Sequence, residues 1–121
     1  MIHPQELRLG NLLNATKVSD TIQVKVKGIE KKTIRTAIFN ISVENLHGIP
    51  LTEEWLIKLG FHEIFGVYAV YGREINLKLS DGYWEAYFKG KYVSVINHVH
   101  QLQNLFYALT GQELVTKPAN E

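Results

Sequence analysis

The first 47 residues alternate between apolar and polar side chains, which is the pattern of β-strands buried on one face. The alternation is clearest from Thr21 to Ile29, and a second apolar run, from Thr33 to Val43, is rich in β-branched residues. Between the two runs, Gly28 to Lys32 has the composition of a turn. With a shorter alternation near Leu7 and Leu9, these runs predict a small twisted sheet or a partly closed barrel.

The pattern changes at Gly48-Ile49-Pro50, and the residues that follow carry the signals of a short helix. Thr52 is suited to accept a hydrogen bond from the free amides of a first turn, and two glutamates come directly after it. Gly60 is suited to the left-handed residue that ends a helix. We therefore expect a helix from Thr52 to Leu59.

The next part of the chain returns to period-two alternation and is divided by short turns. This pattern predicts an antiparallel four-stranded meander with one face covered by helices. The four expected strands are Gly66 to Tyr71, Glu74 to Leu79, Tyr83 to Gly90 and Lys91 to Ile96.

The last element is expected to be a helix from about His98 to Thr110, where apolar residues recur at helical spacing. Asn97 is a suitable residue to cap its first turn, and Gly111 is suited to end it. The helix would cover the meander, so both belong to one core.

These elements predict an α+β fold. A β-rich part covers residues 1–47, an α-ββββ-α arrangement covers residues 51–114, and residues 115–121 form a tail. We expect residues 1–121 to be a single domain, with a sub-domain seam near residues 48–50.

The composition is that of a globular protein and indicates no catalytic or metal site. The chain has 45% hydrophobic and 21% charged residues, as globular proteins do. It has no cysteine, which excludes disulfides, thiolate metal sites and a cysteine nucleophile. Its start does not resemble a signal peptide, and no apolar stretch approaches the roughly 18 residues that span a bilayer. We therefore expect a cytoplasmic protein with no membrane partner.

The net charge of +1 is small but unevenly distributed. Residues 1–47 hold seven Lys/Arg against four Asp/Glu, whereas residues 48–121 hold six against eight. Several of the early basic residues share one strand face and its turn, from which they could contact the phosphates of a nucleic acid. The alternative is an ordinary solvated face, or a strand edge that lysines protect from aggregation. The candidate nucleic-acid contacts are Lys25, Lys27, Lys31, Lys32 and Arg35.

The predicted meander is rich in aromatic residues, and some of them must be exposed if the alternation holds. Tyr83 and Tyr87 face away from the buried side of their strand, which suits a protein interface. The alternative is that both faces of the meander are covered. Gln101 and Asn104 are neighbours on one face of the last helix and are the other candidate contacts for a protein partner; the alternative for them is simple solvation.

His98 and His100 form the only His-x-His sequence in the chain. On a strand they would share a face and could hold one metal ion, but at the start of a helix their side chains should lie about 200° apart. We therefore expect a capping or packing role and no metal site. Asp81 and Glu85 flank one turn and strand without a third group, and no glycine-rich phosphate loop is present. Neither a catalytic site nor a cofactor is predicted.

Three segments of the chain are distinctive when taken together: Ile49 to Phe61, His100 to Leu114 and Glu6 to Asn11. They resemble a group of small uncharacterised proteins found in gut anaerobic bacteria and in their phages and mobile elements. The resemblance implies a shared fold and a mobile-element context. The group has no assigned activity, substrate or catalytic residue that could be transferred.

The leading hypothesis is a non-catalytic binding or accessory module that contacts an unknown protein partner or a second copy of itself. The alternative is an accessory protein that binds nucleic acid through the basic N-terminal face. A third hypothesis is a small enzyme whose site is assembled only in the fold.

Overall fold

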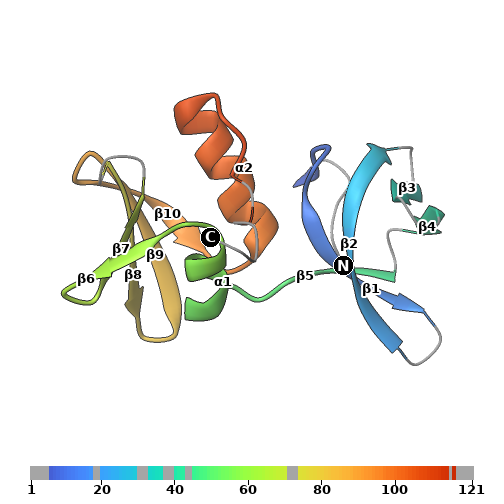
Figure 1. Cartoon of the computed structure of the whole chain (residues 1–121), viewed down its shortest axis with the longest axis horizontal. Coiled ribbons are helices and arrows are strands. Elements are labelled where there is room, and N and C mark those ends of the chain that lie inside the picture. The colour runs from blue at the N-terminus through green and yellow to red at the C-terminus, as the bar shows by residue number, and fades with distance from the viewer. Residues whose placement is uncertain are drawn as a thin grey trace. The chain divides into compact units, whose positions relative to one another are not determined.

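The computed structural model describes residues 6–17, 20–29, 33–36, 40–42, 45–70, 74–114 and 116. Within these ranges the chain forms two five-stranded antiparallel sheets and two helices, so the predicted α+β fold is confirmed (Figure 1). The chain divides into two compact units, Met1–Pro50 with His98–Leu105 and Leu51–Asn97 with Phe106–Glu121. The chain first passes from one unit to the other directly after Pro50. The expectation of a single domain with a seam near residues 48–50 stays a prediction.

The first unit contains a sheet in the order β4-β3-β2-β1-β5, in which all neighbours are antiparallel. The first four strands follow one another as a meander, and the fifth returns to pair with the first. Because β4 and β5 lie at the two ends of this order, the described strands form an open sheet rather than a closed barrel. The strands are β1 (Leu12–Lys17), β2 (Asp20–Ile29), β3 (Thr33–Thr36), β4 (Asn40–Ser42) and β5 (Leu46–Gly48).

The predicted alternation places one face of β1 and β2 in the core of this unit. Leu13 lies opposite Val24 in the ladder, and partners that stand opposite share a face. The register between β2 and β3 shifts between Val26 and Gly28, a bulge that bends the strand. The buried cluster consists of Leu7, Leu13, Ala15, Val24, Val26, Ile34 and Leu46.

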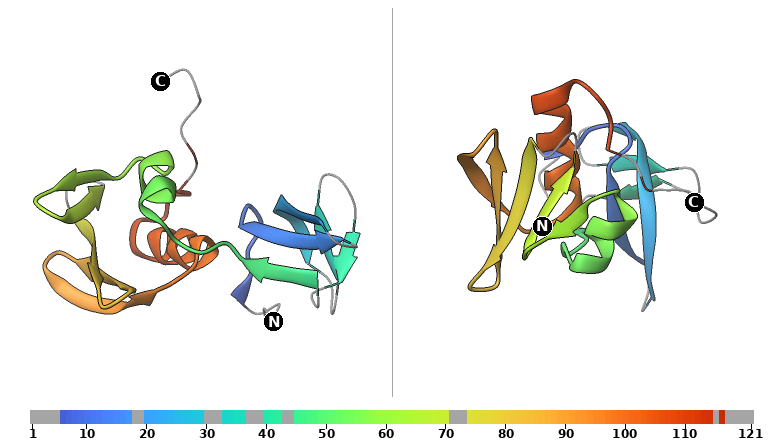
Figure 2. Two further views of the ribbon diagram at one scale, coloured as in Figure 1. Left: turned by 90° about the horizontal axis from the view of Figure 1, so that it is seen from below. Right: turned by 60° about the vertical axis from the view of Figure 1, so that its left-hand side comes forward.

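The second unit contains a sheet in the order β10-β9-β8-β7-β6, so each strand pairs with its neighbour in the sequence (Figure 2). The predicted meander is therefore present, with a fifth strand, β6, that the pattern did not indicate. β6 has only three residues, of which two are polar and exposed, so it carries no apolar alternation. The strands are β6 (His62–Ile64), β7 (Val67–Val70), β8 (Ile75–Ser80), β9 (Tyr83–Phe88) and β10 (Lys91–Ile96).

Three turns of this meander have two residues, and both lie in the left-handed region. The φ angles are 51° and 83° at Phe65-Gly66, 50° and 83° at Asp81-Gly82, and 52° and 82° at Lys89-Gly90. Positive φ at both central residues defines the type I′ turn, whose twist matches that of a hairpin. Glycine at each second position adopts the positive φ without a steric cost.

Helix α1 (Glu53–Lys58) begins and ends as its sequence predicts. The Thr52 hydroxyl accepts a hydrogen bond from the backbone N–H of Trp55 at 3.3 Å. At the other end Gly60 has a φ of 96°, and the N–H of Phe61 donates to the carbonyl of Leu56 at 2.9 Å. The cap and the left-handed glycine therefore fix both ends of a helix too short to be stable alone.

Helix α2 (Val99–Thr110) contributes its residues through Leu105 to the first unit and the rest to the second. A side chain of its first turn caps its N-terminus: Oε1 of Gln101 accepts a hydrogen bond from the backbone N–H of His98 at 3.1 Å. Gly111, with a φ of 74°, ends the helix as predicted. Within the described residues, neither helix is long and apolar enough to cross a membrane.

Replacing Thr52 with alanine should lower the free energy of unfolding by about 1 kcal/mol, because the N–H of Trp55 loses its acceptor. Urea denaturation of the full chain measures the difference. Thr52→Ser keeps the hydroxyl and should retain most of the stability, so equal losses in the two variants would contradict the capping role.

Candidate functional site

Strands β8, β9 and β10 share one sheet face that carries exposed tyrosines. Residues that stand opposite each other on paired strands lie on the same face. Tyr83, Glu85 and Tyr87 of β9 lie opposite polar residues of β8, and Tyr87 and Glu85 also lie opposite residues of β10. We call this surface the outer face; it consists of Asn76, Lys78, Ser80, Tyr83, Glu85, Tyr87, Tyr92 and Val95.

The outer face combines accessible aromatic area with balanced charge. Tyr83 and Tyr92 are each 55% exposed, and Val95 is 41% exposed. The rings of Tyr87 and Tyr92 meet edge to face with their centroids 5.8 Å apart. Tyrosine presents a large and rigid surface with a polar tip, and few side-chain torsions are lost when it is buried by a partner. The arrangement is therefore suited to a protein contact.

The opposite side of β9 is fixed in the core of the second unit. Trp84 is buried, and its Nε1–H donates to the carbonyl of Leu51 at 3.0 Å. The ring of Tyr68 packs edge to face against Trp84, with the centroids 5.6 Å apart. Tyr83 and Tyr87 point away from this buried side, as the alternation predicts, so they stand on a rigid strand. Their role in an interface stays a prediction.

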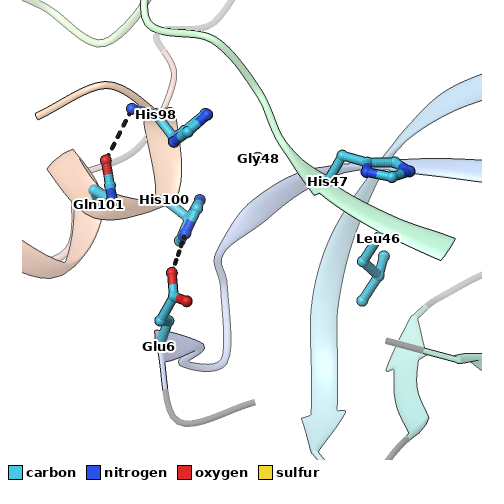
Figure 3. A pocket seen from close by; sticks show the side chains of 7 residues that line it. All are labelled: Glu6, Leu46, His47, Gly48, His98, His100 and Gln101. Carbon is cyan, nitrogen blue, oxygen red and sulfur yellow. Dashed lines mark hydrogen bonds and ion pairs between the residues drawn. The ribbon is translucent and has the colours of Figure 1, made fainter. Parts of the chain in front are cut away.

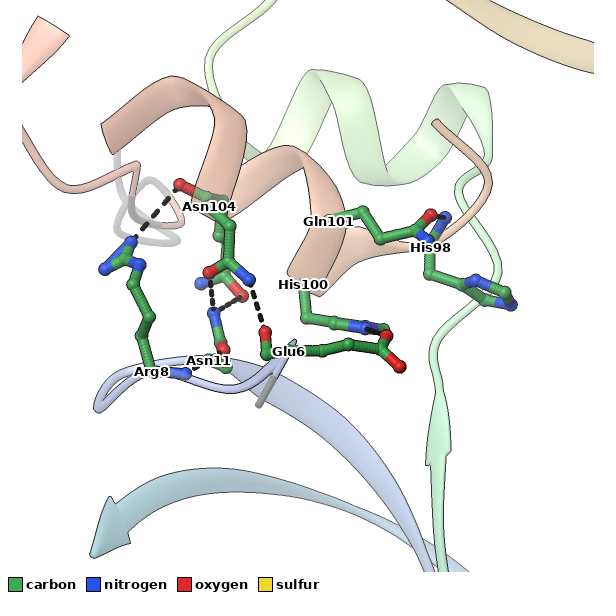
Figure 4. A network of polar contacts seen from close by, with 8 residues as sticks. Glu6, Arg8, Asn11, His98, His100, Gln101 and Asn104 are labelled. Carbon is green, nitrogen blue, oxygen red and sulfur yellow. Dashed lines mark hydrogen bonds and ion pairs between the residues drawn. The ribbon is translucent and has the colours of Figure 1, made fainter. Parts of the chain in front are cut away.

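Gln101 and Asn104, the other predicted interface residues, are taken up by contacts inside the first unit (Figure 4). Gln101 closes the N-terminus of α2 through the amide of His98. Asn104 donates to the carbonyl of Glu6 at 2.6 Å and accepts from the side chain of Asn11 at 2.9 Å. Both amides therefore already make hydrogen bonds within this unit, and their role in a protein interface stays a prediction.

The residue that holds this network together, Gln103, was not predicted from the sequence. Its Oε1 accepts from the backbone N–H of Leu12 at 2.9 Å and from the Asn11 side chain at 3.4 Å. Its Nε2 donates to the carbonyl of Gly10 at 3.2 Å. Gln103 and Asn11 are only 3% and 1% exposed. The sequence does hold a signal for its burial, because Gln103 lies four residues after Val99, on the apolar stripe of the helix.

The basic residues of the first sheet are only partly described. Lys25, Lys27 and Arg35 are exposed. Arg35 lies across Gly28, where an added Cβ would come within 2.8 Å of its Nε, and it donates to the carbonyl of Lys27 at 3.4 Å. The structure therefore brings Arg35 beside Lys27. The other two predicted contacts, Lys31 and Lys32, lie outside the described residues.

His98 and His100 do not point apart, so that prediction is wrong. Their rings are stacked with the centroids 5.8 Å apart and the planes at 24°. His98 precedes the helix and forms an isolated antiparallel bridge with Pro50, so helical spacing does not apply between the two residues. Both line one pocket of about 280 Å³ in the first unit (Figure 3), together with Glu6, Leu46, His47, Gly48 and Gln101.

The pocket collects three histidines without arranging them around a common point. Figure 3 shows the ring of His47 directed away from those of His98 and His100. Across the described part of the chain, no group of three or more histidine or acidic side chains is placed to hold a metal ion. The histidines of the pocket are therefore better considered as hydrogen-bonding groups.

His100 is the buried ionisable group of this pocket, with 1% of its surface exposed. Burial lowers its pKa from the ordinary value of 6.5, because a charged imidazolium loses hydration. The carboxylate of Glu6, 3.3 Å from Nε2, acts in the opposite direction, and His98 adds to the lowering. Burial is the largest of these effects, so the neutral imidazole is favoured.

Comparisons with known proteins give no family for this chain. No family model matches it, and neither a curated protein nor a solved structure does.

Replacing Gln103 with leucine should destabilise the protein by about 3 kcal/mol, because the N–H of Leu12 and the carbonyl of Gly10 would be left buried without partners. The measurement is the free energy of unfolding in urea. Gln23→Leu, at an exposed position of β2, is the matched control and should change stability by less than about 0.5 kcal/mol. Similar losses in both variants would contradict the role of Gln103.

The lowered pKa of His100 predicts that stability depends on pH. Above pH 6.5 the imidazole is neutral in both states; below it the unfolded chain takes up a proton first. The free energy of unfolding should therefore fall as the pH drops from 6.5 to the folded-state pKa. Urea unfolding above and below pH 6.5 measures this slope, which His100→Gln should flatten and the exposed-site control His62→Gln should not. A slope that survives in His100→Gln would contradict the assignment.

Proposed function

We propose that this protein is a non-catalytic binding module that contacts a partner protein through the outer face of its second sheet. The observation that carries the proposal is the exposure of Tyr83 and Tyr92, each 55%, on a face that also presents Val95. Tyrosine is one of the residue types that supply most of the binding energy at protein interfaces when a partner buries them.

The surroundings of the tyrosines support the same conclusion. Lys78 and Glu85 stand opposite each other on β8 and β9, so the centre of the face carries both signs of charge. A surface that binds nucleic acid would instead collect positive charge. Interfaces typically surround rigid aromatic anchors with polar groups that fix orientation, and the outer face has this composition.

Phe65 gives the second unit another exposed aromatic residue. It is fully exposed and has a φ of 51°, although left-handed backbone is unfavourable for a bulky side chain. The turn would be more stable with asparagine or glycine at this position. An exposed aromatic residue kept at a steric cost is consistent with an additional contact at the β6–β7 turn.

Nucleic-acid binding is the second candidate, and fewer observations support it. Three exposed basic residues of the first unit, Lys25, Lys27 and Arg35, carry it, with no aromatic side chain in the described part of β2 and β3 on which a base could stack. Three phosphate contacts would give a weak and strongly salt-dependent affinity.

The test of the proposed function places a photo-crosslinking amino acid at position 83 of the full chain in cells, with position 107 as the matched control. Tyr107, on α2, is 44% exposed and lies outside the outer face. We expect one dominant protein adduct at position 83, either a second copy or another chain. That adduct should be absent at position 107.

The partner is then purified and its affinity measured directly. Changing Tyr83 and Tyr92 together to serine should weaken binding about thirtyfold or more, as for a hot spot of about 2 kcal/mol. Tyr107→Ser should bind as the unmodified chain does. Two results would reject the outer face as the interface. One is that positions 83 and 107 give the same adducts, and the other is that the purified partner binds the double variant as tightly as the unmodified chain.

A further inference from the structure

One nitrogen of the buried His100 lacks a hydrogen-bond partner. Nε2 lies 3.3 Å from Oε1 of Glu6, and an ionised carboxylate only accepts, so Nε2 carries the proton. In a neutral imidazole the other nitrogen, Nδ1, is then an acceptor. Nδ1 makes no hydrogen bond with any of the described residues. Glu6 therefore sets the tautomer that leaves this acceptor unused.

The pocket that His100 helps to line has room for a small ligand. Its volume of about 280 Å³ exceeds the roughly 30 Å³ share of one water molecule and approaches the lower end of ligand pockets, near 300 Å³. Gly48 keeps the space open, because a Cβ at this position would come within 2.7 Å of the His98 ring. The missing side chain lets His98 approach the backbone of β5 closely.

The seven lining residues bring together the unpartnered Nδ1 acceptor of His100 and the carboxylate of Glu6. They include one carboxylate and no lysine or arginine. Buried polar atoms in native proteins are nearly always satisfied, and one that is not marks a place where a ligand or an ordered water is expected. A ligand that matches this lining brings N–H donors and positive charge.

We propose that the pocket binds a primary alkylammonium group, which donates one N–H to Nδ1 of His100 and places its charge beside the carboxylate of Glu6. This site lies in the first unit and uses no residue of the outer face. The ammonium group could belong to a free amine or to a lysine side chain of a peptide, since the chemistry of recognition is the same.

An anion is the other ligand that the position of the pocket suggests, because the N-terminus of α2 lies beside it and helix N-termini attract negative charge. Two of the amides there are already used. The N–H of His98 donates to Gln101, and the N–H of Val99 donates to the carbonyl of Ile49 at 2.9 Å. An anion on His100 would also require protons on both ring nitrogens, and burial lowers the pKa of this imidazole.

The experiment follows the ring nitrogens of the full chain, labelled with ¹⁵N-histidine, by long-range ¹H–¹⁵N correlation above pH 6.5. Nδ1 of His100 should first show the resonance of an acceptor that makes no hydrogen bond. Ethylammonium should shift it saturably towards the hydrogen-bonded position. Tetramethylammonium has the same charge without an N–H, and acetate is an anion, so neither should produce the shift. Tighter binding of Nα-acetyl-lysine amide than of ethylammonium would indicate a peptide as the source.

Variants locate the site. Glu6→Gln should weaken the binding of ethylammonium about tenfold, because a charge-assisted contact is lost. Gly48→Ala should reduce it by pressing the His98 ring into the pocket, while His62→Gln, in the second unit, should leave it unchanged. The proposal is overturned by any of three results in the unmodified chain: no saturable shift with ethylammonium, an equal shift with tetramethylammonium or acetate, or an Nδ1 that is already hydrogen-bonded before any probe is added.

Discussion

The arrangement of the first unit depends on one buried amide. Gln103 accepts from the N–H of Leu12 and donates to the carbonyl of Gly10, so a polar side chain on α2 satisfies backbone groups at the start of β1. These bonds set both the rotation and the height of the first half of α2 in this unit. The positions of His98 and His100, and with them the pocket, follow from that placement. A leucine would bury more apolar area but would not specify the same register.

The features predicted correctly from the sequence are those that neighbouring residues determine. The cap at Thr52, the left-handed Gly60 and the alternation in β9 are local, and the structure contains each of them. The missed features depend on distant partners. The stacking of His98 and His100 follows from a bridge to Pro50, and the role of Gln103 follows from residues some 90 positions earlier. Neither can be derived from spacing along the chain.

The two candidate sites would recognise their ligands by different physical means. The outer face is broad and rigid, and it would gain affinity by removing aromatic area from water. The pocket is small and polar, and it would gain affinity by satisfying one acceptor and one carboxylate. The first depends on matching shapes over several strands, and the second on the protonation of a single imidazole. The two would therefore respond differently to salt and to pH.

The second unit interrupts the chain of the first. Leu51 and Asn97, at the two ends of its first segment, are joined by a hydrogen bond of 2.9 Å, and Ile49 and Val99 of the first unit are joined in the same way. All of residues 51–97 are therefore synthesised before the residues that complete the first unit. Asn11 and Leu12 leave the ribosome long before Gln103, and water has to hydrate their polar groups until α2 arrives. The strands of the second sheet all pair with their neighbours in sequence, so this sheet is synthesised in full before the helix residues that satisfy the start of β1.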